Sequence, residues 1–123
     1  MADLTLTSIR EELEQKTAPF TIEFGTPEKP REVGFNHLLT VESKTRVQFY
    51  ELLSNALTVT TEEAEENPDV YIVFANKIKT TLSVLATNKT DFNALAKFVG
   101  DNYMLWDSIL GKYTEHFKVK PGE

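Results

Sequence analysis

Cysteine is absent from the 123-residue chain, and glycine occurs only five times. Without cysteine the chain has no disulfide, no thiol nucleophile and no thiolate metal ligand. The five glycines are scattered along the sequence, so no glycine-rich loop is present to bind phosphate groups. These two shortages remove several classes of enzyme from consideration.

Long apolar runs and an excess of basic residues are also missing. No run approaches the about 18 apolar residues of a membrane span, and the N-terminus lacks the basic and apolar leader of a secreted protein. We therefore expect a cytoplasmic protein with no membrane partner. The net charge of −6 argues against nucleic acid as a partner, because phosphate recognition needs a surplus of Lys and Arg.

The chain does have the composition of a folded protein, with 41% hydrophobic residues. Its length predicts a single domain over residues 1–123. Within this domain we expect a helix and a hairpin over residues 1–38, a helical bundle over residues 39–117 and a loose tail over residues 118–123.

The stretch "SIREELEQKTAPFTIEFGTPEKPREVGFNHL" predicts a helix followed by a lone hairpin. Ser8 and Glu11 fit a capping box at the start of the helix, and Pro19 requires it to end near Lys16. The segment "GTPEKPRE" has turn chemistry and predicts a loop longer than two residues. Because Pro27 and Pro30 fall in this loop, we expect both edges of the hairpin to stay unblocked.

One face of the predicted hairpin is apolar. Alternation in "PFTIEF" and "EVGF" places five side chains on it, namely Phe20, Ile22, Phe24, Val33 and Phe35. A two-stranded hairpin is marginal in water, so this face needs cover. Two readings remain open: the hairpin closes one end of the bundle, or its open edges add a strand from another chain.

The period changes to that of helices from Thr40 onward. About four helices are expected, with an acidic break at "TVTTEEAEENPD" that we interpret as a loop, either without regular structure or with a frayed acidic turn. The run "VYIVF" is apolar over five residues, which one amphipathic face cannot bury. It therefore lies deep in the bundle or meets another chain, and Tyr71, Ile72 and Val73 join the five hairpin residues as candidate partner-binding positions. The expected fold class is α+β, mostly α.

Residues suited to catalysis are few and unconnected. His37 and His116 lack the spacing of a helical zinc site. The acidic run from Glu62 to Glu66 lacks the alternating ligands and turn glycine of a calcium loop. We therefore expect no catalytic residue, no metal and no cofactor, and interpret the protein as an interaction protein rather than an enzyme.

The order of elements resembles the tail assembly chaperones of long-tailed, siphovirus-type phages, in particular those of actinobacterial hosts. The resemblance spans nearly the whole chain. It lies in the leader "LTLTSIREELEQK", the strand "APFTIEF", the segment "LLTVESKTRVQFYELL", the helix "GDNYMLWDSILGKYTEHF" and the ending "KPGE".

This resemblance implies a protein that coats the long helical tape measure protein, keeps it soluble and recruits subunits of the major tail tube protein. It also implies self-association into a homo-oligomer, a place in the host cytoplasm and absence from the finished virion. Two alternatives are a structural tail or head-completion component, and a small acidic inhibitor that mimics nucleic acid.

Overall fold

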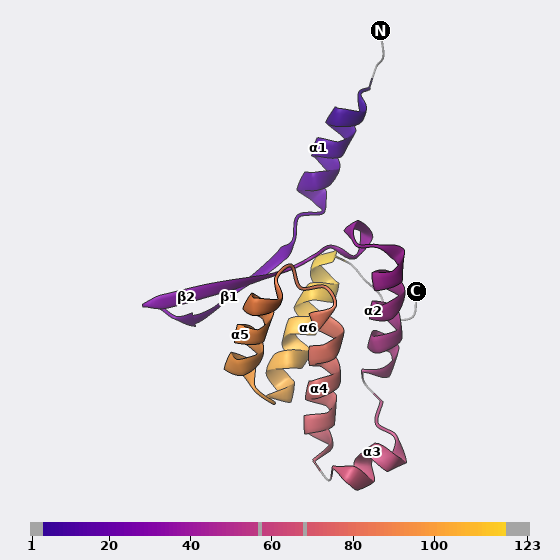
Figure 1. Cartoon of the computed structure of the whole chain (residues 1–123), viewed down its shortest axis with the longest axis vertical. Coiled ribbons are helices and arrows are strands. Elements are labelled where there is room, and N and C mark those ends of the chain that lie inside the picture. Colours follow the sequence, from indigo (N-terminus) through magenta and orange to yellow (C-terminus); the bar gives the residue numbers. More distant parts are fainter. Residues whose placement is uncertain (1–3, 57, 68, 118–123) are drawn as a thin grey trace.

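The computed structural model describes residues 4–56, 58–67 and 69–117 and confirms a mostly helical α+β fold. The predicted tail, residues 118–123, lies outside the described residues. An N-terminal helix and a two-stranded antiparallel hairpin precede a short 3₁₀ turn and five further helices (Figure 1). The elements are α1 (Leu6–Lys16), β1 (Phe20–Thr26), β2 (Lys29–Phe35), η1 (Leu38–Thr40), α2 (Ser43–Asn55), α3 (Thr61–Glu66), α4 (Val70–Ser83), α5 (Lys89–Val99) and α6 (Tyr103–Phe117).

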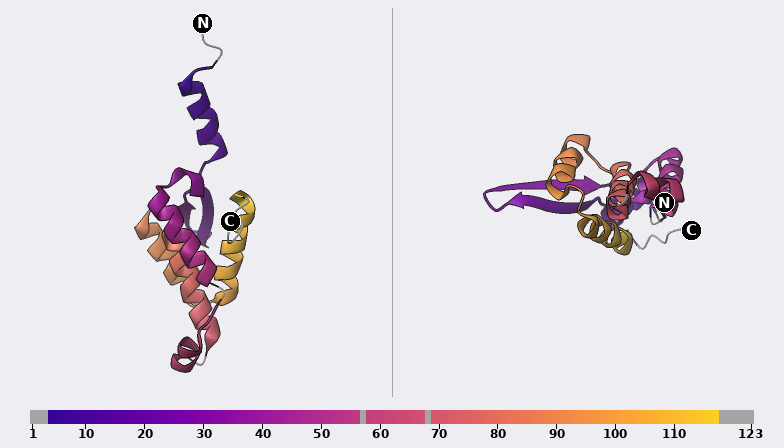
Figure 2. Two further views of the ribbon diagram at one scale, coloured as in Figure 1. Left: turned by 90° about the vertical axis from the view of Figure 1, so that its right-hand side faces the viewer. Right: turned by 90° about the horizontal axis from the view of Figure 1, so that it is seen from below.

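Two elements project from the helical body. The views in Figures 1 and 2 show α1 extending from one end of the molecule and the hairpin reaching out sideways as an arm. The helix α1 ends at Lys16 as predicted, but it begins at Leu6, and not at Ser8. Thr5 is the N-cap, since its side chain accepts a 3.1 Å hydrogen bond from the backbone N–H of Ser8.

The hairpin turn is tighter than the sequence predicts. Pairs run from Phe20–Phe35 to Thr26–Lys29, which leaves only Pro27 and Glu28 in the turn. Pro30 lies within β2 opposite Gly25, so the prediction of a long loop that contains both prolines was wrong. The backbone of Gly25 has a φ of 95°, a value that residues with a side chain rarely adopt. Glycine at this position therefore allows the tight turn to form.

The outer edge of β2 is partly covered, contrary to the prediction of two free edges. The Gly34 carbonyl accepts a 2.9 Å hydrogen bond from Thr87, and the Asn36 N–H donates one of 2.7 Å to Leu85. The backbone N–H and C=O groups of successive residues point to opposite edges of a strand. Pro30 therefore faces the same edge as Gly34, and because proline has no N–H, this edge has no hydrogen-bond donor at that position. Within the described residues, no backbone hydrogen bond from outside the hairpin reaches the edge of β1.

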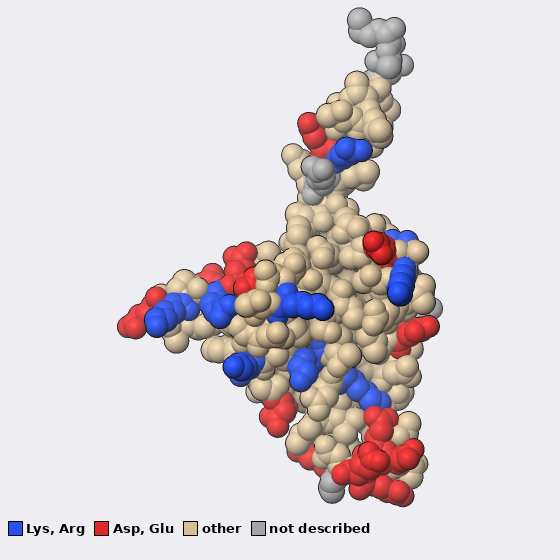
Figure 3. Space-filling model, viewed as in Figure 1, with Lys and Arg blue, Asp and Glu red and all other residues tan. Residues whose placement is uncertain are grey.

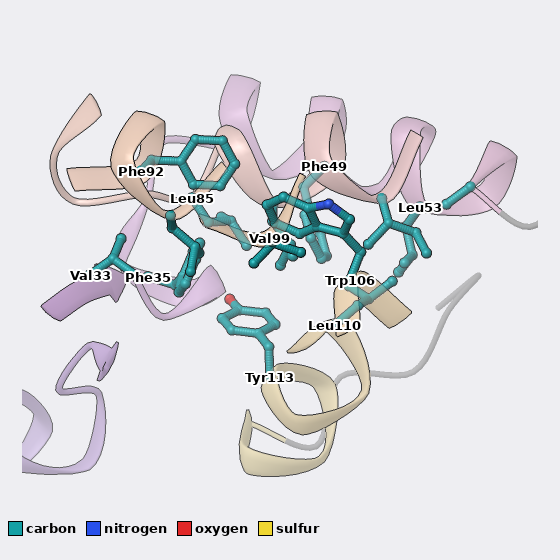
Figure 4. Packing of buried hydrophobic residues seen from close by; sticks show 14 of the residues in the cluster. Val33, Phe35, Phe49, Leu53, Leu85, Phe92, Val99, Trp106, Leu110 and Tyr113 are labelled. Carbon is teal, nitrogen blue, oxygen red and sulfur yellow. The ribbon is translucent and has the colours of Figure 1, made fainter. Parts of the chain in front are cut away.

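The hydrophobic core lies where the root of the hairpin meets the helices (Figure 4). Helix α4 packs against both α2 and α6, and α5 packs against β2. Trp106 and Tyr113 of α6 are fully buried, and the indole N–H of Trp106 donates a 2.8 Å hydrogen bond to the Gly100 carbonyl. Val33 and Phe35 belong to this core.

The acidic stretch contains a helix where the sequence predicted a loop. Thr60 and Glu63 form a complete capping box, in which each side chain accepts a 3.1 Å hydrogen bond from the other's backbone N–H. No residue of α3 is buried. A cap, not an apolar face, therefore nucleates this helix.

Candidate interaction surfaces

The apolar side of α1 is not covered by the described part of the chain. Leu6, Ile9 and Leu13 recur at three- and four-residue steps, which places them on one face of the helix. Their side chains are 72%, 38% and 53% exposed. An isolated helix of 11 residues is marginal in water, so this face is suited to contact with another chain.

A groove runs between α2 and α4 and is closed at one end by α3. Its volume is about 350 Å³, and it is lined by Leu52, Asn55, Glu63, Val73, Asn76, Lys77 and Thr80. The Lys77 ammonium lies 3.0 Å from the Glu63 carboxylate. The hydrogen bond from the Thr60 backbone, and then the hydrogen bond from Lys77, lowers the pKa of Glu63. This ion pair lies in the wall of the groove.

A second apolar hollow lies where α4 and α6 begin. It has a volume of about 500 Å³ and is lined by Tyr71, Asn102, Tyr103 and Met104. The Tyr71 and Tyr103 ring centroids are 5.3 Å apart, and Phe74 lies 5.7 Å from Tyr103. Met104 is 78% exposed and Tyr71 61%. We call the surface made by Tyr71, Tyr103 and Met104 the aromatic end surface.

The hairpin arm rests on α5. The Phe24 and Phe98 ring centroids are 5.8 Å apart, and Arg31 forms a 3.5 Å ion pair with Asp91. The backbone carbonyl of Gly34 points away from β1. In β1, the backbone N–H and C=O groups of its partner Thr21, and of Glu23 two residues later, therefore point to the outer edge of that strand. Among the described residues, no backbone hydrogen bond from outside the hairpin reaches this edge of β1.

Charge is unevenly distributed over the surface. Figure 3 shows acidic residues gathered at the end of the molecule that carries α3, whereas the hairpin carries both acidic and basic residues and Lys and Arg spread over the adjacent helices on the same face. The acidic end includes Glu62, Glu63, Glu65 and Glu66. No group of His, Asp and Glu that could hold a metal ion occurs within residues 4–56, 58–67 and 69–117.

The eight residues predicted to bind a partner divide by burial. Val33 and Phe35 are completely enclosed in the core and cannot face a partner, because the hairpin root docks with this face inward. Phe20, Ile22 and Phe24 are half-buried and pack against the core. Tyr71 is exposed, while Ile72 and Val73 are half-buried.

Sequence reasoning missed two surface residues. Leu105 is 47% exposed, although it directly precedes the fully buried Trp106. Met104 was not selected at all, although it is the neighbour of Tyr103 in the hollow. The available signal in the sequence was an apolar residue near the start of a helix and next to a residue of the core.

The two histidines come closer together than their sequence contexts indicated. His37 and His116 both contact the ring of Phe117, with centroid distances of 4.2 and 4.7 Å. Burial, and then the charge of His116, lowers the pKa of His37. The His37 Nδ1 atom accepts a 3.0 Å hydrogen bond from the Leu39 N–H, which gives this residue a structural role as a cap.

No helix in the described part of the chain has both the length and the apolar character to cross a membrane. Comparison with protein-family models, with curated proteins and with solved structures gives no match.

Proposed function

We propose that this protein is a non-enzymatic tail assembly chaperone of a long-tailed phage. It binds the tape measure protein in the host cytoplasm, keeps it soluble and recruits major tail tube subunits. The observation that carries the proposal is the amount of apolar surface left outside the core: the stripe of α1, the groove between α2 and α4, and the aromatic end surface. Such surfaces on a small protein mark sites for other chains.

The groove between α2 and α4 is the site that we assign to a helix of the tape measure protein. An amphipathic helix can bind by laying its apolar face into a groove between two helices. Leu52 and Val73 supply the apolar walls, and Asn55, Asn76 and Thr80 supply polar contacts along the rim. The net charge of −6 would counteract aggregation of the resulting complex.

The open edge of β1 is the site that we assign to the tail tube subunit. Strand addition uses the unpaired backbone groups of an exposed edge, and Thr21 and Glu23 present such groups. Glu23→Pro removes one outward N–H and should abolish tail tube recruitment while the tape measure complex stays soluble. Glu23→Ala, which keeps the N–H, should recruit normally. Equal recruitment by both variants would refute this assignment.

The main test is co-expression with the tape measure protein encoded in the same phage genome, followed by size-exclusion chromatography with light scattering. We expect a soluble complex with many copies of this chain per tape measure protein. Val73→Glu should reduce the yield of the complex, because it places a charge in the groove. Val47→Glu is the matched control, because Val47 is an exposed valine of α2 outside the groove.

An insoluble tape measure protein, with this chain eluting alone, would refute the chaperone function. Mass spectrometry of purified virions would then test the structural-component alternative, which requires the protein to remain in the particle. The alternative of a nucleic-acid mimic has less support, since the densest acidic residues gather at α3 instead of following one surface.

A further inference from the structure

We infer that the aromatic end surface binds an arginine side chain carried by an aliphatic segment of a partner protein. This goes beyond the proposed chaperone function, which uses the groove between α2 and α4 and the edge of β1. The site combines the hollow of about 500 Å³ lined by Tyr71, Tyr103 and Met104 with the carboxylates that flank it. Arginine suits such a site because a planar guanidinium stacks on an aromatic ring and also pairs with a carboxylate.

The first argument is the arrangement of the rings. The ring centroid of Tyr103 lies 5.3 Å from that of Tyr71 and 5.7 Å from that of Phe74, and the Tyr71 and Phe74 centroids are 6.4 Å apart. Rings at these distances are in direct contact, so a ligand packs on the outer side of the cluster and not between the rings. Tyr71 is 61% exposed and Met104 78%. A guanidinium over the Tyr71 ring gains a cation–π attraction, and aliphatic neighbours cover Met104.

The second argument is charge of one sign around this surface. Residues 60–76 and 98–111, which contain the starts of α4 and α6, have no Lys or Arg, and their acidic residues are Glu62, Glu63, Glu65, Glu66, Asp69, Asp101 and Asp107. The acidic residues of α3 gather at this end of the molecule because α3 packs against α4 (Figure 3). The bordering basic residues are Lys77 and Lys97, and Lys77 is paired with Glu63 at 3.0 Å. Acidic residues thus remain in excess and favour a cationic ligand.

The third argument is that two of these carboxylates lie at the helix starts that form the hollow. Asp69 caps α4, since its Oδ1 atom accepts a 3.1 Å hydrogen bond from the backbone N–H of Tyr71. Asp101 is exposed and lies two residues before Tyr103, the first residue of α6. Long side chains of a helix lean toward its N-terminus, so both tyrosines lean toward these acids. The N-terminal dipoles of the two helices disfavour a cation, and the two carboxylates offset that effect.

The test is an NMR titration of the full chain with a short synthetic peptide in which leucine and arginine alternate. The chain has two methionines, so the methyl signal of Met104 is readily assigned and reports on the hollow. We expect the peptide to shift this signal with a dissociation constant below about 1 mM. A peptide with citrulline in place of arginine keeps the side-chain shape without the charge, and should bind about tenfold more weakly. Salt raised from about 50 mM to about 500 mM should weaken binding of the arginine peptide only.

Two variants separate the ring from the charge. Tyr71→Leu removes the ring and keeps an apolar side chain, whereas Asp69→Asn removes the charge and keeps the cap, because asparagine accepts the same hydrogen bond. Each should weaken binding of the arginine peptide by about threefold or more. The matched controls are Phe98→Leu, an exposed ring of α5, and Glu51→Gln, an exposed acid of α2, both outside the hollow. Both controls should bind as the wild type does, and circular dichroism confirms that each variant is folded.

Three results would overturn the inference. One is a Met104 methyl signal that stays in place up to about 5 mM peptide. Another is equal affinity for the arginine and citrulline peptides, which would reduce the site to an apolar surface without preference for a cation. The third is a set of shifts confined to the amides of α3, which would place the peptide on the acidic residues there. The titration contains no tape measure protein and no tail tube subunit, so its outcome is independent of the proposed chaperone function.

Discussion

The hydroxyl of Tyr113 donates a 2.9 Å hydrogen bond to the backbone carbonyl of Asn36. Tyr113 belongs to the last helix, and Asn36 directly follows the hairpin. The Asn36 N–H in turn bonds the Leu85 carbonyl between α4 and α5. Asn36 is therefore the point at which α6, the hairpin and the α4–α5 connection are joined. Burial raises the pKa of Tyr113 and keeps its hydroxyl protonated as a donor.

Tyr113→Phe should lower the free energy of unfolding by about 1–2 kcal/mol, because it leaves the carbonyl of the partly buried Asn36 without this donor while preserving the ring. Urea denaturation at low protein concentration measures the change. Tyr71→Phe removes the hydroxyl of an exposed tyrosine and should change stability by less than about 0.5 kcal/mol. Equal stabilities of the two variants would show that the bond to Asn36 contributes little.

We expect opposite effects on stability from two glycine substitutions, one beside the tight hairpin turn and one in the last helix. A Cβ on Gly25 would lie 2.7 Å from the Lys29 carbonyl oxygen, at a φ of 95°. Gly25→Ala should therefore destabilise the hairpin by about 1–2 kcal/mol. Gly111 lies inside α6, where an added Cβ would point into open space, and Gly111→Ala should stabilise the protein by about 0.5–1 kcal/mol. Thermal unfolding of the two variants should shift in opposite directions.

Because His37 acts as a cap in its neutral form, we expect the protein to lose stability in mild acid. The lowered pKa of His37 favours the neutral imidazole in the folded state, so its contribution is present above about pH 6.5 and is lost as the pH falls below that value. Protonation of Nδ1 would also break the bond from the Leu39 N–H. Asparagine can accept the same hydrogen bond without titrating, so His37→Asn should flatten the dependence of unfolding free energy on pH between about 7 and about 5.

The neighbouring histidine supplies a second measurement of the same effect. The charge of His116 is the smaller of the two causes that lower the pKa of His37. His116→Gln should therefore move the pKa of His37 partway back toward its ordinary value, as followed by NMR titration of the imidazole. An unchanged titration would leave burial as the sole cause.

The short helix α3 should unfold locally when its cap is removed. It has no buried residue and is held by the Thr60–Glu63 capping box and the Lys77–Glu63 ion pair. Thr60→Ala should speed hydrogen exchange of the α3 amides about fivefold or more, since loss of an N-cap costs about 1 kcal/mol. Thr61→Ala, one residue into the helix, is the control and should leave exchange nearly unchanged. The exchange of α4 amides should be the same in both variants.

Periodicity alone identified most of the regular structure. The alternation of Phe20, Ile22 and Phe24 predicted the face of β1 that packs on the core, and the register with Val33 and Phe35 confirms that all five share one face. Pro19 correctly marked the end of α1. These features are local, because side-chain direction follows from backbone geometry over a few residues.

Features that depend on competing local signals were harder to predict. The local pattern around Pro30 predicts a turn. Proline is nevertheless tolerated in β2, because the position of its absent N–H lies at the outer edge, where no bond to β1 is lost. The acidic stretch reads as a loop, yet Thr60 and Glu63 complete a capping box that outweighs the lack of an apolar face. In each case the outcome depends on the backbone N–H groups of one or two residues, which side-chain periodicity does not show.

By itself, the sequence determined which residues are apolar and how they align along each helix and strand. Only the tertiary structure decided which of these apolar faces are buried by other parts of the same chain. Val33 and Phe35 are enclosed because α5 and α6 meet at the root of the hairpin, whereas Leu13 of α1 and Met104 of α6 are left exposed. Burial is a property of long-range packing, and local spacing carries no information about which distant element arrives to provide it.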